Sequence, residues 1–285
     1  MNGDEQQNIV LCRTHVNLGN LIMNLGLSGK VAIVGGSSKG LGKACAEALA
    51  QEGVKLAVCA RGQEDLQSTA AEIKEIYGTE VLTVVADLTK YEDIKRLVSE
   101  TLSTFGRIDI LVNNTGGPPP GGFFDHDDQA WEAAFQRLFM YVVRICREVI
   151  PHMKKQGWGR IINDTSFTVK EPLDNIILSN VFRVGVISLA KTLSRELARY
   201  SITVNNVCPG SFDTERIRQI FEDRATASGR TIDQVRNELI SSIPAGRMQK
   251  PEELAHLVVF LASEKASGIT GTTIQVDGGM VRGLF

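Results

Sequence analysis

Residues 31–42 read Val-Ala-Ile-Val-Gly-Gly-Ser-Ser-Lys-Gly-Leu-Gly, and this stretch decides the fold of the 285-residue chain. Its apolar start predicts a buried strand, its glycines a tight turn, and the pattern of residues 44–52 a helix. Glycines let the backbone approach a phosphate, and the helix N-terminus supplies free N–H groups and a partial positive charge. The stretch therefore predicts a pyrophosphate cradle, although its G-x-x-x-G-x-G spacing differs from the common G-x-G-x-x-G fingerprint.

The same alternation of apolar runs and helical patterns continues along the chain. The predicted strands are 31–34, 56–59, 81–86, 108–112, 160–163, 202–207 and 273–276, and the predicted helices are 44–52, 66–77, 94–105, 131–153, 180–200 and 252–263. Short apolar strands separated by helices are typical of a parallel sheet covered on both faces. Right-handed crossovers then give an α/β fold, a single-domain doubly wound parallel sheet (Rossmann fold) of about seven strands.

Two segments fall outside this alternation. Residues 1–26 are polar without a clear period, and we expect a loosely ordered N-terminal extension before a domain that spans 27–285. Residues 215–243 form a polar helical insert, which suits a mobile lid. The loop 117–122 is rich in proline and glycine, follows the fourth strand, and is expected to flank the ligand site together with this insert.

Composition excludes several classes of protein. The net charge is -2 and no basic run occurs, so a nucleic-acid surface is not expected. The five cysteines are scattered without a CxxC pair, which indicates reduced thiols in a cytoplasmic protein and no metal site. No continuous run of 18 apolar residues and no secretory signal occur, so no membrane association is expected.

Four further motifs follow predicted strands in order. They are Asp87-Leu88, Asn113-Asn114-Thr115-Gly116, the loop from Pro209-Gly210 to Thr214, and Val276-Asp277-Gly278-Gly279. Together with the glycine-rich turn, these motifs resemble those of the short-chain dehydrogenase/reductase family, including its 3-oxoacyl-ACP reductases, from about residue 27 to residue 279. The resemblance implies an oxidoreductase with a nicotinamide cofactor. It assigns cofactor contacts to Gly36, Ser38, Lys39, Gly40, Leu41, Gly42, Arg61, Asp87, Leu88, Asn114, Gly116, Arg183, Pro209, Gly210 and Thr214.

The form of the cofactor follows from charge. An acidic residue at the end of the second strand would bind a ribose 2′-hydroxyl and repel a 2′-phosphate. Here Ala60 and Arg61 stand at that place, and Lys39 lies in the glycine-rich turn. Because arginine pairs with phosphate bidentately and lysine adds a point charge, the sequence predicts NADP(H) rather than NAD(H).

The catalytic positions that the resemblance implies are only partly filled. The family's serine is present as Ser166, but Ser179 stands at the position of its tyrosine and Arg183 at the position of its lysine. The family's helical asparagine is replaced by Leu138. An aliphatic hydroxyl is a far weaker acid than a phenol, and arginine stays protonated, so the standard proton relay is absent.

Other groups are candidates for the missing acid. Asp164 lies at a strand end, where burial raises a carboxyl pKa, while Tyr141 offers a phenol from the long helix 131–153. Ser166 either holds the substrate carbonyl or only caps a turn. Lys170 and Glu171 are expected to be solvated. Phe123, Phe124 and Phe212 either line an apolar pocket or serve packing.

Two functions from different classes remain open at this point. The first is an NADP(H)-dependent oxidoreductase acting on a carbonyl/alcohol pair through a non-standard relay that includes Ser166, Ser179 and Arg183. The second is a weak or inactive NADP(H)-binding protein that acts as a sensor, ligand binder or partner subunit. Arg183 favours a small-molecule substrate with an anionic group. Apolar residues on more than one face of helices 131–153 and 180–200 predict a homodimer or homotetramer.

Overall fold

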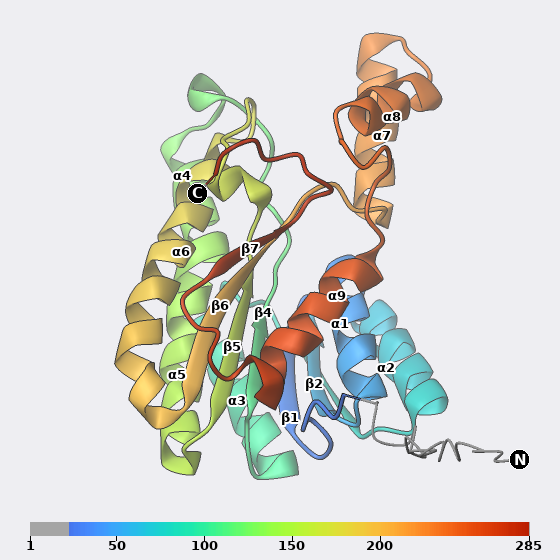
Figure 1. The fold of residues 1–285 in the computed structure, drawn as a ribbon. Coiled ribbons are helices and arrows are strands. Elements are labelled where there is room, and N and C mark those ends of the chain that lie inside the picture. The colour runs from blue at the N-terminus through green and yellow to red at the C-terminus, as the bar shows by residue number, and fades with distance from the viewer. Residues whose placement is uncertain (1–22, 285) are drawn as a thin grey trace, which may run out of the picture.

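A computed structural model of the chain describes residues 23–284 (Figure 1). The predicted extension 1–26 lies mostly outside the described residues. Within the described residues the strands are β1 (Val31–Gly35), β2 (Lys55–Ala60), β3 (Val81–Val85), β4 (Ile110–Asn113), β5 (Gly159–Asp164), β6 (Ile202–Pro209) and β7 (Thr273–Val276). The α-helices are α1 (Gly40–Gln51), α2 (Gln63–Tyr77), α3 (Tyr91–Phe105), α4 (Asp128–Phe135), α5 (Tyr141–Gln156), α6 (Ile177–Leu197), α7 (Glu215–Ser228), α8 (Ile232–Ser241) and α9 (Pro251–Ala262).

The seven strands form one parallel sheet in the order β3-β2-β1-β4-β5-β6-β7. The chain runs outward from β1 to β3, then crosses to β4 on the other side of β1 and continues outward to β7. This reversal places the carboxyl ends of β1 and β4 beside each other at the middle of the sheet, where open α/β sheets bind ligands. The predicted doubly wound fold is confirmed.

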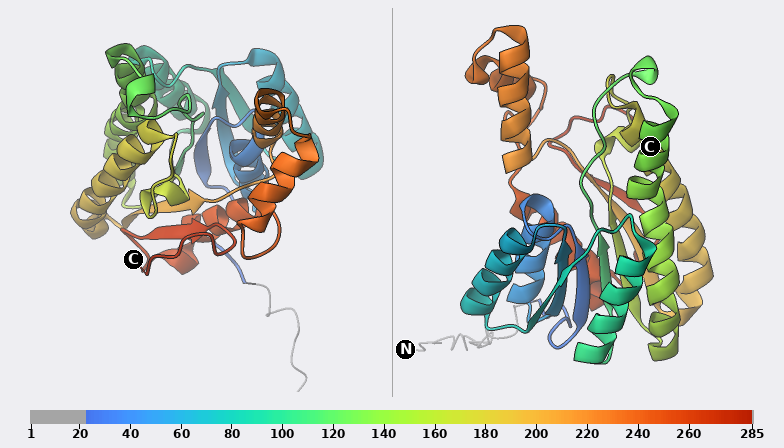
Figure 2. Two further views of the ribbon diagram at one scale, coloured as in Figure 1. Left: turned by 90° about the horizontal axis from the view of Figure 1, so that it is seen from above. Right: turned by 180° about the vertical axis from the view of Figure 1, so that it is seen from behind.

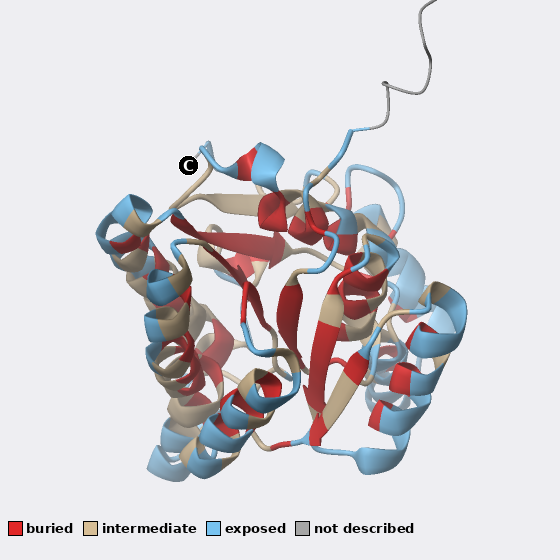
Figure 3. Cartoon of the chain, turned by 90° about the horizontal axis from the view of Figure 1, so that it is seen from below, coloured by how far each residue is buried: buried red, intermediate tan, exposed pale blue. Residues whose placement is uncertain are grey.

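Helices cover both faces of the sheet, and Figure 2 shows the two layers from above and from behind. Residues of α1, α2 and α9 form one apolar core with one face of the strands, and residues of α3, α5 and α6 form a second core with the other face. The central strands are accordingly buried on both sides, as the red ribbons of Figure 3 show, whereas the edge strand β7 is half-buried throughout. Burial of both faces explains why these strands read as continuous apolar runs rather than alternating patterns.

The predicted single helix over 131–153 is wrong in one respect. The structure divides it into α4, a π-helical turn η3 (Gln136–Met140) and α5. Leu138, which the sequence analysis placed at the position of the family's helical asparagine, is buried within this turn at 2% exposure. A π-turn adds one residue to a helical turn and is frequent at functional sites. Apolar periodicity cannot reveal it, because the flanking helices keep the same apolar stripe.

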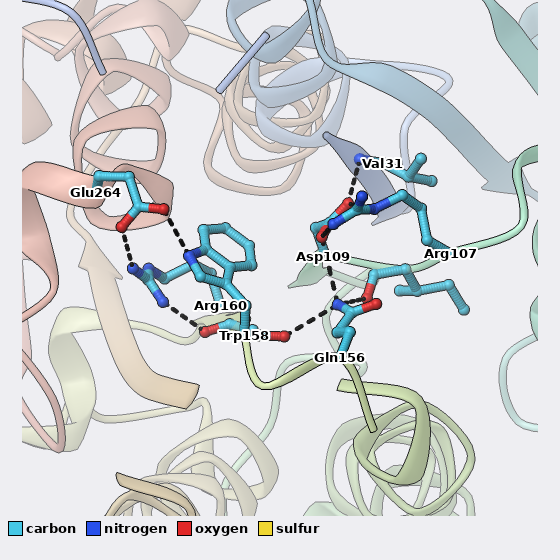
Figure 4. A network of polar contacts seen from close by, with 9 residues as sticks. Val31, Arg107, Asp109, Gln156, Trp158, Arg160 and Glu264 are labelled. Carbon is cyan, nitrogen blue, oxygen red and sulfur yellow. Dashed lines mark hydrogen bonds and ion pairs between the residues drawn. The ribbon is translucent and has the colours of Figure 1, made fainter. Parts of the chain in front are cut away.

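A polar network connects the amino-terminal ends of several strands (Figure 4). It lies at the opposite edge of the sheet from the carboxyl ends, where a ligand is expected to bind. The buried carboxylate of Asp109 accepts hydrogen bonds from Val31 N and from the Arg107 guanidinium at 2.6 to 2.9 Å. Nearby, Glu264 accepts a hydrogen bond from Trp158 Nε1 at 2.8 Å and lies 3.5 Å from the Arg160 guanidinium. Because the buried charges of Asp109 and Arg160 are paired within the protein, they stabilise this end of the sheet and do not indicate a ligand site.

Helices α7 and α8 project from the main body of the domain. They follow β6 and stand beyond the carboxyl ends of the strands, at the top of Figure 1. They pack on each other through a small core of their own that includes Phe221, Val235 and Ile243. Polar helices with a small separate core open more easily than the sheet does, so this region is suited to movement over the ligand edge.

Candidate active site

A cavity of about 800 Å³ opens at the carboxyl ends of the central strands. Its wall is formed by the glycine-rich turn, the loop after β4, the end of β5, the start of α6, the loop after β6 and the start of α7. A second cavity of about 370 Å³ lies on the side of β2 and β3, and Gly36, Gly116 and Arg216 line both cavities. Every cofactor residue expected from the sequence lines one cavity or both, except Gly42.

The glycine-rich turn has the geometry of an anion cradle. Gly36 and Gly40 both adopt φ of 57°, a left-handed conformation that favours glycine. A Cβ on Gly42 would collide with the carbonyl oxygen of Gly36, so this glycine permits the close packing of turn and helix. Lys39, the N-cap of α1, makes no side-chain capping bond, and the first turn holds no acidic residue. The N–H groups at the start of α1 therefore remain free for a phosphate.

Two motif residues organise the neighbouring loops. Asn114 Nδ2 donates to the carbonyls of Gly35 and Gly36 at 3.0 and 3.3 Å, which ties the loop after β4 to the glycine-rich turn. Asp87 Oδ1 accepts from both the backbone N–H and the hydroxyl of Thr89, at 3.1 and 2.8 Å. These bonds hold the rim of the second cavity in one shape before any ligand arrives.

The two cations expected at a 2′-phosphate differ in their surroundings. Arg61 is exposed at the second cavity and forms no ion pair with another described residue. Lys39 instead lies 3.3 Å from both Asp65 and Glu215, and hydrogen bonds to these carboxylates raise the Lys39 pKa. Because two carboxylates already offset Lys39, Arg61 is the freer partner for a phosphate. These pairs could not be predicted from the sequence, because Asp65 lies on α2 and Glu215 on α7.

Ser166 lines the larger cavity. It follows β5 and is the N-cap of the short helix η4 (Phe167–Val169). Its Oγ accepts from the backbone N–H and the hydroxyl of Thr168, at 3.2 and 3.0 Å. Because both acceptor positions of Oγ are occupied, its own hydrogen is left to donate. Capping and substrate binding are thus compatible roles.

Ser179 and Arg183 form one unit on the inner face of α6. Arg183 Nε donates to Ser179 Oγ at 3.2 Å, while Nη1 donates to the carbonyls of Asp164 and Thr165 at 3.1 and 2.7 Å. The guanidinium therefore clamps α6 to the end of β5 as well as lining the cavity. Ser179 Oγ accepts this bond, so its proton also remains available as a donor.

Asp164 is the last residue of β5 and lines the larger cavity. Its Oδ1 is sealed from solvent and has no hydrogen-bond partner among the described residues. Loss of hydration raises the pKa of this carboxyl from 3.8 to about 7, and the neighbouring Arg183 charge opposes the shift. The carboxyl can therefore hold or release a proton near neutral pH.

The structure separates the other candidates from the cavity. Tyr141 is 3% exposed within the core, burial raises its pKa, and it does not line the cavity. Of the three phenylalanines, Phe212 lines the cavity, whereas Phe123 and Phe124 are 61% and 96% exposed. Lys170 and Glu171 do not line it either.

One lining residue was missed by the sequence analysis. Arg216, near the start of α7, reaches across the cavity to Gly117, where a Cβ would lie 2.8 Å from its Nη2. Arg137 Nη1 approaches the carbonyl of the same glycine at 3.5 Å. Loss of hydration lowers the Arg216 pKa, and the charges of Arg183 and Arg137 lower it further. No carboxylate of the described residues pairs with these three arginines, so the site is suited to an anion. A cation directly after the Pro209–Thr214 loop was the available signal.

The thiols and possible metal ligands are unremarkable in geometry. Cys45, Cys59, Cys146 and Cys208 are free and buried, whereas Cys12 lies outside the described residues. Between residues 23 and 284, no group of three or more His, Cys, Asp or Glu side chains is arranged to hold a metal ion.

Fold and site together define a nucleotide-binding oxidoreductase scaffold, and comparison with known proteins specifies the family. The sequence model of a family described as enoyl-(acyl carrier protein) reductase matches residues 36–281. The chain belongs to the short-chain dehydrogenase/reductase family, and the oxidoreductase class predicted from the sequence is confirmed.

Several relatives align over nearly the whole chain. An uncharacterized oxidoreductase, YvrD of Bacillus subtilis, is 35% identical over 92% of this chain and 100% of its own length. The 3-oxoacyl-[acyl-carrier-protein] reductase FabG of Staphylococcus epidermidis is 34% identical over 88% of this chain and 98% of its own. The crystal structure of L-sorbose reductase from Gluconobacter frateurii, complexed with NADPH and L-sorbose, superposes with a TM-score of 0.89 and 34% identity. That match covers 92% of this chain and 100% of the reductase.

Proposed function

We propose that this protein reduces a carbonyl group to an alcohol with NADPH, through a relay that lacks the family's tyrosine and lysine. The observation that carries the proposal is one continuous cavity. It joins a glycine-rich anion cradle at one end to the donor-oriented hydroxyl of Ser166 at the other. A dinucleotide bound across this cavity would supply a hydride at the end where a small carbonyl compound fits.

The residues present fit NADP(H) better than NAD(H). β2 ends at Ala60 without a carboxylate, and the unpaired Arg61 follows it at the second cavity. The pyrophosphate fits the free N–H groups at the start of α1, and the loop from Pro209 to Thr214 lines the nicotinamide end. The relatives crystallised with NADPH, including the L-sorbose reductase, support this choice.

The chain's own residues would position the substrate in three ways. Ser166 donates a hydrogen bond to the carbonyl oxygen, and Ser179 offers a second hydroxyl whose orientation is set by Arg183. Arg183 supplies a fixed positive charge that stabilises negative charge developing on that oxygen. Arg216 adds a second cation to the cavity, which supports the binding of an anionic group there.

We also propose that α7 and α8 act as a lid. The cavity lies between the loop 117–122 and the first turn of α7, and Arg216 already spans this gap. Closure would exclude water and bring the lid cation towards the bound anion. The main body of the domain would stay rigid, because its two cores do not include these helices.

A homo-oligomer built on α6 is a further part of the proposal. The segment Ile177–Tyr200 would be long and apolar enough by composition to cross a membrane, yet only 22% of its most apolar window is buried. It packs on β6 through one face, and Val181 and Val184 remain 48% and 47% exposed on another. A second copy of the chain would cover this apolar face. A cytoplasmic location stays a prediction.

One observation favours the second function, a cofactor-binding protein with little turnover. Within the described residues no phenol lines the cavity, and the Nε and Nη1 groups of Arg183 already donate to Ser179 and two backbone carbonyls. Such a protein would bind NADPH as a sensor or partner subunit without passing on its hydride.

The experiment that tests the proposal separates these functions. NADPH and NADH are first titrated against the protein by fluorescence. NADPH consumption is then followed across a panel of ketones, oxoacyl thioesters and sugar lactones. Preferential NADPH binding with turnover of at least one carbonyl supports the reductase. Binding without turnover supports the second function, and absence of binding at millimolar concentration excludes both.

A further inference from the structure

Among the described residues that line the larger cavity, Asp164 is the one titratable side chain that is neither an arginine nor a member of an ion pair. The titratable residues that line it are Lys39, Asp164, Arg183, Glu215 and Arg216, and none of its lining residues is Tyr, His or Cys. Lys39 and Glu215 pair with each other at the rim, where their side chains are 52% and 74% exposed. Arginine stays protonated throughout the physiological range. By elimination, Asp164 is the candidate for proton transfer among the described residues that line this cavity.

The surroundings of Asp164 leave its carboxyl unneutralised and uncommitted. The titratable groups that face it are Cys45 on α1, Tyr141 on α5, Cys208 on β6 and Arg183 on α6. Burial raises the pKa values of the two thiols and the phenol, so all three stay neutral. Arg183 is the one charge among them, and its hydrogen bonds go to backbone carbonyls and Ser179 rather than to the carboxyl.

A structural role does not account for this arrangement. A buried carboxylate that supports a fold accepts several hydrogen bonds, as Asp109 does at the opposite edge of the sheet. Asp164 Oδ1 accepts none within the described residues, and an unpaired buried polar atom is destabilising. Loss of hydration that destabilises the ion, in a carboxyl whose residue lines a cavity, is typical of a group kept for chemistry.

We propose that Asp164 is the proton donor of the carbonyl reduction, in the place of the absent tyrosine. The inference rests on the proposed function. A reduced nicotinamide held in the cavity would supply a hydride to the carbonyl carbon, with the π electrons of the C=O bond passing to oxygen. The O–H bond of Asp164 breaks, its proton passes to that oxygen, and an alcohol results. The carboxylate that remains lies in the same cavity as the oxidised, positively charged nicotinamide, which offsets its charge.

The kinetic test replaces Asp164 by Asn, which keeps the shape and removes the acid. The control is Asp174→Asn, the same change on an exposed loop residue that does not line the cavity. Removal of a general acid lowers the rate constant by about 10²- to 10⁴-fold. We expect a loss of this size in kcat for Asp164→Asn, with NADPH affinity within about 3-fold of the parent protein, and no change for Asp174→Asn.

The pH dependence gives a readout that a packing role would not move. Because the protonated form is the donor, kcat for reduction should fall as pH rises through about 7, the pKa of this carboxyl. Oxidation of the product alcohol should show the opposite dependence, since the carboxylate then accepts the proton. Asp164→Asn should flatten both profiles, and Asp174→Asn should leave both intact.

A second measurement does not depend on turnover. The cationic ring of NADP⁺ favours the ionised carboxyl, so binding of NADP⁺ at pH 7 should release a fraction of a proton. Calorimetry in buffers of different ionisation enthalpy counts this proton. We expect release for the parent protein and for Asp174→Asn, and none for Asp164→Asn.

The failures are distinguishable. If neither coenzyme binds, or if binding occurs with no carbonyl reduced, the proposed function is wrong. The assignment of Asp164 as proton donor is then wrong as well. If carbonyls are reduced but Asp164→Asn keeps its kcat, its pH profile and its proton release, only the assignment of Asp164 is overturned.

Discussion

Arg183 donates from Nε to the hydroxyl of Ser179 across one turn of α6, at a distance of 3.2 Å. These residues stand where the family resemblance predicts a tyrosine and a lysine, and here they form a hydrogen-bonded pair. The hydroxyl cannot replace the phenol as an acid, and the guanidinium cannot exchange protons. What the pair retains is a fixed positive charge and an oriented donor, so the cavity keeps its electrostatics and loses its usual proton source.

Restoring both side chains should restore the usual relay. We expect Ser179→Tyr combined with Arg183→Lys to raise kcat for carbonyl reduction by about 10-fold or more, because lysine can poise a nearby phenol. NADPH consumption measures the effect. Arg183→Lys alone is the control and should lower kcat, since lysine cannot reach Ser179 and both carbonyls together. An active enzyme that is unaltered by the double change would refute the assignment of these positions.

Arg61 should select between the two coenzymes. We expect Arg61→Ala to raise the Kd for NADPH by about 10-fold or more and to leave the Kd for NADH unchanged, because only NADPH carries the 2′-phosphate. Lys39→Ala should have a smaller effect, since Asp65 and Glu215 already offset that charge. Fluorescence titration with both coenzymes gives the four constants. An equal loss for NADH and NADPH would contradict a 2′-phosphate contact.

Arg216 should bind an anion common to both coenzymes. Its guanidinium touches Gly117 and lines both cavities, which is where a pyrophosphate would cross from one to the other. We expect Arg216→Met to raise the Kd values for NADPH and NADH alike, by about 5-fold each. Arg218→Met, on the same helix but outside both cavities, is the control. Unchanged coenzyme affinity with a raised KM for an anionic substrate would instead place the substrate against Arg216.

The stability of the protein should depend on Asp164 above neutral pH. Its pKa is raised from 3.8 to about 7 on folding, so the folded state binds the proton more tightly than the unfolded state. The resulting stability is present below the unfolded pKa and is lost as pH rises through about 7. Asp164→Asn should therefore stabilise the protein at pH 8, by about 2–4 kcal/mol, and have little effect at pH 4. Urea unfolding at both pH values measures the difference, and equal effects at both would contradict the raised pKa.

Gly42 should be intolerant of any side chain. An added Cβ would collide with the Gly36 carbonyl oxygen and with Asn114 Nδ2, so turn, helix and loop would have to separate. We expect Gly42→Ala to weaken NADPH binding by about 10-fold or more and to destabilise the fold by about 1–3 kcal/mol. Gly268→Ala is the control, because a Cβ there meets nothing within 4 Å. Calorimetric titration and thermal unfolding check both effects, and intact NADPH affinity in Gly42→Ala would speak against a tightly packed cradle.

The sequence anticipated the architecture and most of the cavity wall. Strand positions and the doubly wound sheet followed from patterns that are local in the chain, and the cofactor-site role of the motif residues was implied by the family resemblance. The order of substituted positions was also readable, because Ser166, Ser179 and Arg183 lie at fixed separations along the chain. Local patterns also misled in places: the helix over 131–153 contains a π-turn, and Phe123 and Phe124 lie at the surface.

Apolar periodicity and glycine spacing alone determined the fold and the cradle, because both depend on neighbours along the chain. Tertiary structure alone decided which charged groups of the site are paired, which are free and which are shielded from water. It paired Lys39 with carboxylates of α2 and α7, set Arg216 against Gly117, and sealed one oxygen of Asp164 without a partner. The physical reason is that hydration and Coulomb energies depend on which distant groups surround a charge in space, and separation in sequence does not encode those distances.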